Sequence, residues 1–352
     1  MLQTDESYMQ RCLQLATLGA GHVAPNPMVG SVLVYENKII GEGYHRKYGQ
    51  AHAEVNCIAS VTETDIPLIE KSTLYVSLEP CVHYGKTPPC SDLIIQMKIP
   101  EVVIGCRDPS PEVNGKGIEK LKAAGVNVVN GILESDCKAL NRRFFTFHTK
   151  QRPYIILKWA QTSDKKIAAN NDKRLKISNK FTDRIVHKWR SEEAAILVGT
   201  HTVLVDNPSL TNRLWSGKNP IRLVVDKELK LPSDARIFNN DAPTIVFNFH
   251  KSTINLSPEL SNQVYYYKIE NPTDLVKQIC EACYRLNIQS ILVEGGAKLL
   301  QSFIDENLYD ELRVIINESM QIEKGVNAPV INRLGKVSTS YKIKSDKIEV
   351  FL

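Results

Sequence analysis

The sequence predicts two consecutive α/β domains. At 352 residues the chain is longer than one typical domain and suits two. Short apolar runs typical of strands alternate with amphipathic helical patterns, which is the signature of layered α/β domains. This pattern breaks at residues 146–153, where polar and basic residues precede Arg152-Pro153. We therefore expect one domain at residues 1–147 and a second at 152–352.

The first domain is expected to open with a helix, because Met9, Cys12, Leu13 and Ala16 form one apolar stripe with helical spacing. The strands that follow are short apolar runs bounded by glycine, proline or polar residues. In order, we expect a helix at 5–19, strands at 31–35 and 38–41, a helix opened by His52, a strand at 73–78, a helix at 91–97, a strand at 102–105, a helix at 117–124, a strand at 126–130 and a last helix at 133–147.

The second domain shows the same alternation, and no internal repeat or low-complexity segment interrupts it. Its strands are expected at 154–160, 194–199, 221–226, 243–247, 264–267, 290–294, 312–316 and 347–352, and its helices at 180–192, 273–286 and 297–306. This order predicts a second α/β unit of comparable size.

Bulk composition excludes several classes of protein. The hydrophobic fraction of 43% suits packed cores. The sequence contains no run of about 18 apolar residues, so we expect no membrane span. Residues 1–6 are acidic and lack the apolar segment of a secretion signal, so we expect a cytoplasmic protein. A net charge of +5 is mild for a nucleic-acid binder and compatible with phosphorylated small molecules.

Eight cysteines are spread along the chain, and in a reducing cytosol they are expected to be thiols or metal ligands. Cys280 and Cys283 have the spacing of a redox or metal motif, but they lie in a helical pattern without a second pair, which favours packing. Only Cys81 and Cys90 lie in a loop rich in proline and glycine. These two cysteines are therefore the candidates for metal binding or catalysis.

Two segments supply a candidate catalytic zinc site. His52 and Glu54 form a His-x-Glu motif, and Cys81 and Cys90 lie in the segment Pro80–Cys90. One imidazole and two thiolates favour zinc, and three protein ligands leave a fourth position for water. At a helix N-terminus, His52 could bind the metal while Glu54 moves protons as the general base and acid. The alternative is a structural zinc site with His83 as fourth ligand, which would leave Glu54 without a role.

The segment Pro80-Cys81-x-His83-x-Gly85-x-Thr87-Pro88-Pro89-Cys90 resembles the deaminase half of the bifunctional riboflavin biosynthesis deaminase–reductase family. Pro25-Asn26-Pro27-Met28-Val29-Gly30 is similar to the substrate loop of that family, and the similarity continues through Arg107-Asp108-Pro109. The resemblance implies a cytidine-deaminase-like α/β/α domain, with Asn26 at the pyrimidine edge. An asparagine in a loop could also serve only to cap a turn. Lys86 and Thr87 could meet a substrate phosphate or only shape the loop.

Without the family resemblance, the sequence of the second domain gives only a weak indication of its function. A buried strand ending at Glu294 is followed by Gly295-Gly296 and a helix, an arrangement that lets a phosphate approach the backbone. Residues 197–213 are similar to the reductase signature of the same family, which implies a dihydrofolate-reductase-like fold and NADPH as cofactor. By this resemblance, Thr202, Asp206, Gly295 and Gly296 would meet the cofactor, and Arg190, Leu210, Arg213 and Glu294 the ribose phosphate of the substrate.

Lys158 is a charged residue inside the apolar strand 154–160. Because lysines are rarely buried without a partner, it either faces the substrate as a catalytic group or lies on an edge strand facing water. Two departures from the family pattern fall nearby: Asp164-Lys165 replaces Asp-Gly, and Leu175-Lys176-Ile177-Ser178, preceded by Arg174, replaces a Trp-Ile-Thr/Ser segment. Because of these departures, the sequence leaves open which residues between 164 and 178 contact the substrate.

We therefore expect a bifunctional enzyme of riboflavin biosynthesis that uses Zn²⁺ and NADPH. It would deaminate 2,5-diamino-6-(5-phosphoribosylamino)pyrimidin-4(3H)-one and then reduce the ribosyl group of 5-amino-6-(5-phosphoribosylamino)uracil to ribityl. Its expected partner is this phosphorylated pyrimidine, with neither nucleic acid nor membrane, in a homo-oligomer. The alternatives are a nucleoside or RNA base deaminase with a C-terminal binding domain, and a non-catalytic protein stabilised by zinc.

Overall fold

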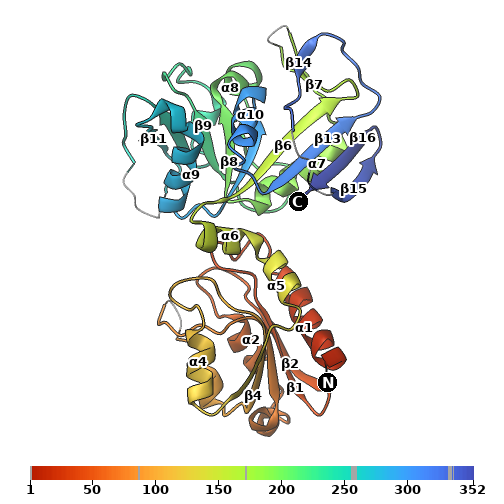
Figure 1. The fold of residues 1–352 in the computed structure, drawn as a ribbon, viewed down its shortest axis with the longest axis vertical. Helices are drawn as coiled ribbons and strands as arrows, with labels where there is room; N and C mark the ends of the chain where they lie inside the picture. The colour runs from red at the N-terminus through yellow and green to blue at the C-terminus, as the bar shows by residue number, and fades with distance from the viewer. Residues whose placement is uncertain (1, 86–87, 171–172, 255–259, 332–334, 336) are drawn as a thin grey trace. The chain divides into compact units, whose positions relative to one another are not determined.

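The computed structural model describes residues 2–85, 88–170, 173–254, 260–331, 335 and 337–352. The chain divides between Lys150 and Gln151 into two compact units, each with its own sheet (Figure 1). Among the described residues, no helix is both long enough and apolar enough to cross a membrane.

The first unit is built on a mixed sheet in the order β2-β1-β3-β4-β5 (Figure 1). β1 pairs antiparallel with β2 and β3, whereas β3, β4 and β5 run parallel. The strands are β1 (Gly30–Tyr35), β2 (Lys38–Tyr44), β3 (Thr73–Leu78), β4 (Glu101–Cys106) and β5 (Asn127–Asn130). The helices are α1 (Leu2–Thr17), α2 (Ala53–Ala59), α3 (Cys90–Gln96), α4 (Lys116–Ala123), α5 (Glu134–Leu140) and α6 (Arg142–Lys150), with a 3-10 turn η1 (Ile66–Lys71).

Helices cover both faces of this sheet because successive strand residues point to opposite sides. Val32 packs with Met9 and Cys12 of α1 in one core, whereas the next residue, Leu33, packs with Cys57 of α2 in another. The result is the three-layer α/β/α arrangement that the sequence predicts.

The prediction of one helix over residues 133–147 is wrong. The structure has two helices, α5 and α6, separated at Asn141. The buried side chain of Asn141 donates to the carbonyl of Met28 and accepts from its backbone N–H, each over 2.8 Å. A side chain that satisfies two backbone groups of a distant loop leaves no trace in helical periodicity.

The second unit contains a sheet in the order β11-β10-β9-β8-β12-β6-β13-β16-β15 and a two-stranded sheet of β7 and β14. Its strands are β6 (Tyr154–Thr162), β7 (Lys166–Ala169), β8 (Ala195–Gly199), β9 (Ile221–Val225), β10 (Thr244–Asn248), β11 (Val264–Lys268), β12 (Ser290–Gly295), β13 (Glu311–Asn317), β14 (Gly325–Asn327), β15 (Val337–Ile343) and β16 (Asp346–Phe351). Its helices are α7 (Lys180–Glu192), α8 (Thr200–Asp206), α9 (Leu275–Arg285) and α10 (Ala297–Asp305), with 3-10 turns η2 (Arg236–Phe238) and η3 (Pro272–Asp274).

Strand β6 lies inside the large sheet, between β12 and β13, so Lys158 is not on an edge strand. Ile155 and Leu157 belong to the core that includes α9 and α10, whereas Ile156 packs with Val186 and Trp189 of α7. Because side chains alternate along a strand, Lys158 follows Ile156 on the face covered by α7. This excludes the water-facing alternative for Lys158.

Three strands and one α-helix of the second unit have no counterpart in the sequence-based prediction: β7, β14, β15 and α8. β15 is exposed along nearly its whole length, so no buried face marks it in the sequence. It forms because it pairs with β16 at the end of the sheet. α8 has seven residues, too few for helical periodicity to be read.

The departure at Lys165 has a backbone consequence. Lys165 is exposed and has φ 60°, in the left-handed region that glycine occupies most easily. Its N–H donates to the carbonyl of Thr162 in the turn between β6 and β7. The turn therefore keeps a conformation suited to glycine although this chain has lysine there.

We expect Lys165→Gly to raise the free energy of unfolding of the second unit by about 0.5–1 kcal/mol, because the strain it relieves exceeds the added entropy of the unfolded chain. Chemical denaturation of the full chain measures this. Arg184→Gly, in the exposed interior of α7, is the matched control and should destabilise by about 1 kcal/mol. A loss of stability in Lys165→Gly would contradict the strain argument.

Candidate active sites

The His-x-Glu motif begins a helix, as its expected chemistry requires. His52 has an extended backbone (φ −73°, ψ 171°) and is the N-cap of α2, and Glu54 lies in the first turn. His52 therefore precedes the helical twist that would otherwise point the two side chains apart. Both side chains can approach one point.

The two cysteines reach the same point from different elements. Cys81 follows β3 after a short loop, and Cys90 is the first residue of α3. Nδ1 of His52 lies 3.6 Å from Sγ of Cys81 and 3.4 Å from Sγ of Cys90. With Zn–S near 2.3 Å and Zn–N near 2.05 Å, a tetrahedral zinc site requires N···S separations of about 3.5 Å. The donor set and its spacing fit zinc.

Glu79 anchors the loop that presents Cys81. Its buried carboxylate accepts hydrogen bonds of 2.9–3.2 Å from four backbone N–H groups, those of Asp108, Gly115, Gly117 and Ile118. Glu79 is not among the residues predicted from the sequence, although a glutamate that directly precedes Pro-Cys at a strand end is a visible signal. Glu79 fixes the strand end two residues before the cysteine.

Electrostatics prepare the cluster for a cation. The hydrogen bond from Cys90 is the largest cause that lowers the pKa of Cys81, to about 4, and His52 acts in the same direction while burial opposes it. Burial raises the pKa of Glu54, and attraction to His52 only partly offsets this. A carboxyl group with a raised pKa is better able to take up and release protons near neutral pH.

His83 does not belong to this cluster. Among the described residues, the group of possible ligands here comprises His52, Cys81 and Cys90, whose ligand atoms lie within 4.8 Å of one another. The side chain of His83 is 44% exposed, and its Nε2 lies 3.7 Å from a carboxylate oxygen of Glu112. This arrangement favours three protein ligands over the four-ligand alternative.

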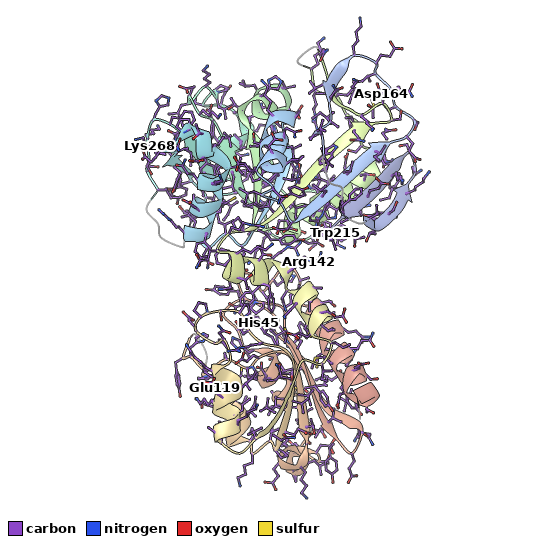
Figure 2. All side chains as sticks on the ribbon, viewed as in Figure 1. His45, Glu119, Arg142, Asp164, Trp215 and Lys268 are labelled. Atoms are coloured by element: carbon purple, nitrogen blue, oxygen red, sulfur yellow. The ribbon has the colours of Figure 1, made fainter. Side chains whose placement is uncertain are left out.

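Asn26 is connected to the cluster through His45, which the sequence analysis missed. Nδ2 of Asn26 lies 3.2 Å from Nε2 of His45, and Nδ1 of His45 lies 3.1 Å from the carbonyl of Ala51. His45 directly follows β2 (Figure 2), and its ring packs edge-on against His52 at 5.3 Å. Burial lowers the pKa of His45. Lys86 and Thr87 lie outside the described residues.

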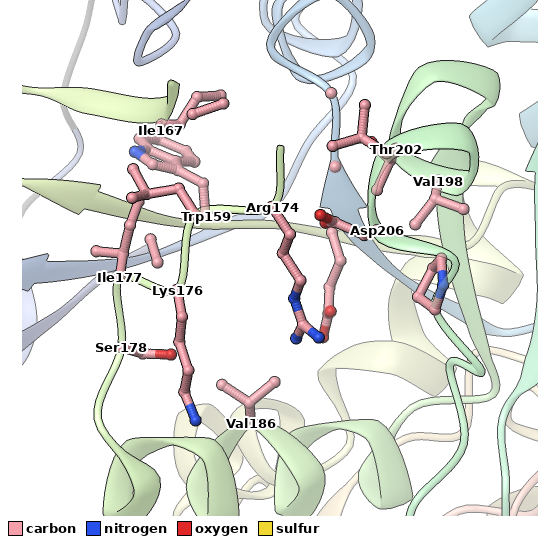
Figure 3. A pocket seen from close by; sticks show the side chains of 18 of the residues that line it. Trp159, Ile167, Arg174, Lys176, Ile177, Ser178, Val186, Val198, Thr202 and Asp206 are labelled. Carbon is pink, nitrogen blue, oxygen red and sulfur yellow. The ribbon is translucent and has the colours of Figure 1, made fainter. Parts of the chain in front are cut away.

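The second unit contains a cavity of about 710 Å³ between β6, α7, α8 and the turn after β12 (Figure 3). All nine site residues that the sequence analysis names in this domain line it: Lys158, Arg190, Thr202, Asp206, Leu210, Arg213, Glu294, Gly295 and Gly296. They come from segments up to 138 positions apart in the chain, from Lys158 to Gly296. One cavity is therefore lined by all the site residues predicted for this domain.

The two glycines at the end of β12 and the start of α10 can cradle a phosphate. A Cβ at Gly295 would lie 3.1 Å from Oγ1 of Thr202, and Gly296 has φ 80°. Gly296 is the N-cap of α10 and provides no capping side chain, so backbone N–H groups at this helix start are available to an anion. The turn fits a nucleotide cofactor such as NADPH.

Arg190 and Glu294 form an ion pair at this cavity. The guanidinium donates to both carboxylate oxygens over 3.0 and 2.6 Å, with side chains 13% and 6% exposed. Among the described residues, the nearby Lys158 has no hydrogen-bond or ion-pair partner. Burial is the largest cause that lowers the pKa of Lys158, with attraction to Glu294 opposing it.

The cavity carries excess positive charge. Seven lysines and arginines line its described part, against three carboxylates: Lys158, Lys173, Arg174, Lys176, Arg190, Arg213 and Arg236 against Asp183, Asp206 and Glu294. Two of the carboxylates are engaged, Glu294 with Arg190 and Asp183 with Lys176 at 2.8 Å. Such an excess favours an anionic ligand.

Arg174 and Lys176, which replace family-typical residues, both belong to this cationic lining. Figure 3 shows their side chains extending along one side of the cavity, with Thr202 and Asp206 across from them. In the sequence, these positions stand out as departures from the family pattern without a predicted role. The structure shows that the departures add charge to the cavity.

Fold and sites together define a two-domain enzyme, with a His-Cys-Cys deaminase domain before a nucleotide-binding reductase domain. Residues 2–106 match the cytidine and deoxycytidylate deaminase zinc-binding region, and residues 153–319 match the RibD C-terminal domain. Riboflavin biosynthesis protein RibD of Aquifex aeolicus is 40% identical over 99% of this chain and 96% of its own. The chain belongs to the RibD family of riboflavin biosynthesis proteins.

Solved structures agree with this assignment. The Thermotoga maritima diaminohydroxyphosphoribosylaminopyrimidine deaminase/5-amino-6-(5-phosphoribosylamino)uracil reductase is 37% identical, with a TM-score of 0.86 over 99% of this chain and 98% of its own. Acinetobacter baumannii RibD is 30% identical, with a TM-score of 0.88 over 100% and 99%. These likenesses confirm the predicted family, fold class, pair of enzymatic activities, and zinc and NADPH as cofactors.

We expect Arg174→Met to weaken binding of a phosphorylated ligand in the cavity about three- to tenfold and to reduce its dependence on salt, because one cation facing the ligand is lost. Calorimetric titrations with NADP⁺ and with ribose 5-phosphate at two salt concentrations measure this. Arg184→Met, on the exposed side of α7, is the control for total charge. Equal affinities in the wild type and Arg174→Met for both ligands would remove Arg174 from the site.

Proposed function

We propose that this chain catalyses two consecutive steps of riboflavin biosynthesis. The first unit hydrolytically deaminates 2,5-diamino-6-(5-phosphoribosylamino)pyrimidin-4(3H)-one. The second reduces the ribosyl group of the resulting 5-amino-6-(5-phosphoribosylamino)uracil to ribityl with NADPH. The observation that carries this proposal is that two complete sites occur in one chain: the His52-Cys81-Cys90 cluster with Glu54, and the cationic cavity.

In the deaminase unit, His52, Cys81 and Cys90 hold zinc, which supplies the charge that makes a water molecule nucleophilic at neutral pH. Glu54 takes one proton from the attacking water and passes it to the ring nitrogen, and then carries the second proton from the added hydroxyl to the departing amine. Its raised pKa suits this exchange, and its burial keeps other water away. The amide of Asn26, in contact with His45, hydrogen-bonds the pyrimidine edge.

In the reductase unit, Thr202, Asp206, Gly295 and Gly296 hold NADPH, which supplies a hydride. The N–H groups at the start of α10 meet its phosphates. Bound NADPH would supply this hydride for the carbon that was the anomeric centre, in the imine form of the opened sugar. The polar groups on the opposite side of the cavity bind the open sugar chain.

Lys158, Arg190 and Glu294 act as one group in this site. Lys158 protonates or positions the opening sugar, because its lowered pKa makes the ammonium a better acid than a solvent-exposed lysine. Glu294 holds Arg190 in a bidentate pair, so Arg190 presents less free charge to a phosphate than Arg213 does. Leu210 is buried at the cavity wall and shapes the ribose site.

We further propose a cytoplasmic homo-oligomer without a nucleic-acid partner. The mild net charge supports the last point. A base deaminase acting on RNA would bind polynucleotide tightly and with strong salt dependence, so a titration with polynucleotide at two salt concentrations separates the two functions.

Glu54→Gln should retain zinc and lose deamination, because the amide cannot carry the proton. We expect a fall in kcat of about 10²–10⁴-fold, while elemental analysis still finds the metal. Ammonia release from the diaminopyrimidinone phosphate is the readout, and NADPH oxidation on the deaminated substrate is the internal control. Substantial ammonia release by this variant would contradict the assignment of Glu54.

Lys158→Met should slow single-turnover NADPH oxidation about 10²-fold or more while leaving ammonia release unchanged. In the wild type, the reduction rate should fall as pH rises through the lowered pKa of Lys158, because the ammonium is the active form. Lys180→Met, at the exposed start of α7, serves as control. An unchanged rate in Lys158→Met would remove Lys158 from the mechanism.

A further inference from the structure

His187 is a buried histidine at the reductase cavity that the mechanism above does not use. It lies on α7 one turn before Arg190, is 5% exposed and lines the cavity. Its Nδ1 accepts the backbone N–H of Arg213 over 2.9 Å and, at a longer 3.4 Å, that of Leu214. The side chain thus connects a helix to the backbone of a proposed ligand-binding arginine.

These hydrogen bonds fix the tautomer of the ring. A ring nitrogen that accepts from an N–H carries no proton, so in the neutral imidazole the proton is on Nε2. Burial, together with the positive charges of Arg190 and Arg213, lowers the pKa of His187 to about 4, so the ring is neutral near pH 7. Among the described residues Nε2 has no hydrogen-bond partner, which leaves Nε2–H as a donor at the cavity.

Arg213 needs such an anchor because its segment has no regular structure. Residues 207–220, between α8 and β9, form neither helix nor strand. Within the described part of the chain, the guanidinium of Arg213 donates only to Oγ1 of Thr211, over 3.0 Å. The nearby positive charges of Arg190, Arg236 and Arg174 favour its displacement towards solvent.

Helix α7 holds this segment at two neighbouring points. His187 accepts from the backbone of Arg213, and Arg190 makes a long contact of 3.5 Å with the carbonyl of Thr211. The pair Arg190–Glu294 in turn fixes Arg190 to the end of β12. The shorter of the two contacts to the segment, and the one that reaches residue 213 itself, comes from His187.

We propose that His187 is a positioning residue for phosphate-ester recognition in the reductase cavity. Nδ1 fixes the backbone of Arg213, so that its guanidinium stays at the cavity against the repulsion of the other arginines. The inference rests on the proposed function only in taking Arg213 as a ligand of the ribosyl phosphate.

The first test compares two variants in the full chain saturated with NADP⁺, with ribose 5-phosphate as probe and ribose as its uncharged control. His187→Asn places an amide oxygen where Nδ1 accepts, so binding should stay within about threefold of the wild type. His187→Leu removes the acceptor, and binding should weaken about tenfold or more. Equal losses in both variants would overturn the proposal, because the acceptor would then not matter.

A double-mutant cycle separates positioning from general support of the fold. If His187 acts through Arg213, His187→Leu should cost little further affinity in an Arg213→Met background. Additive losses would show that His187 does not act through Arg213 and would overturn the proposal. Arg184→Met combined with His187→Leu is the matched control and should behave additively.

A second measurement does not require any variant to bind the ligand. In ¹⁵N-histidine-labelled wild type, the signals absent from His187→Asn should show a neutral ring with its proton on Nε2 at pH 7. A proton on Nδ1, or a charged ring, would overturn the proposal. A wild type that shows this tautomer and binds ribose 5-phosphate but does not oxidise NADPH would contradict the proposed function and leave this inference standing.

Discussion

The chemistry of the first unit depends on bringing one imidazole and two thiols to a common point. Two thiolates this close repel each other, so both can be charged only when a cation lies between them. The pKa values show this, since hydrogen bonding lowers that of Cys81 while the interaction with Cys81 raises that of Cys90. Glu79 and the N-terminus of α2 hold the three groups in place despite this repulsion. The fold therefore builds a site that zinc completes.

The second unit solves the opposite electrostatic problem, an excess of positive charge. Burial opposes ionisation of Glu294, yet Arg190 and Lys158 lower its pKa to about 2. The carboxylate therefore stays charged across the working pH range, holds Arg190 in place and stabilises the ammonium of Lys158. Because Glu294 lies near the end of β12, directly before Gly295 and Gly296, one residue connects the proposed sugar site to the proposed cofactor site.

Local patterns sufficed to predict what depends on short stretches of sequence. The zinc ligands, Glu54 and the apolar strands are motifs or runs of this kind, and the structure brings the predicted residues of each unit together. The break at Asn141 and the contact of His187 with Arg213 depend on partners distant in the chain. Strand β15 pairs with the next strand, β16, but its exposed residues give no buried face to recognise. A single sequence carries no local signal for such partners, so only the folded structure reveals them.

The two departures from the family pattern differ in physical consequence. At Lys165 the backbone keeps a left-handed turn, so the substitution costs stability at an exposed position away from the cavity lining. Arg174 and Lys176 instead face the cavity, where Lys176 pairs with Asp183 and Arg174 is attracted to Asp206. Since Arg190 is engaged by Glu294, Arg174 and Arg213 are among the cations that remain for a phosphate. Arg174 and Lys176 therefore add electrostatic attraction to the cavity, which makes binding of an anionic ligand here more sensitive to salt than an apolar contact would.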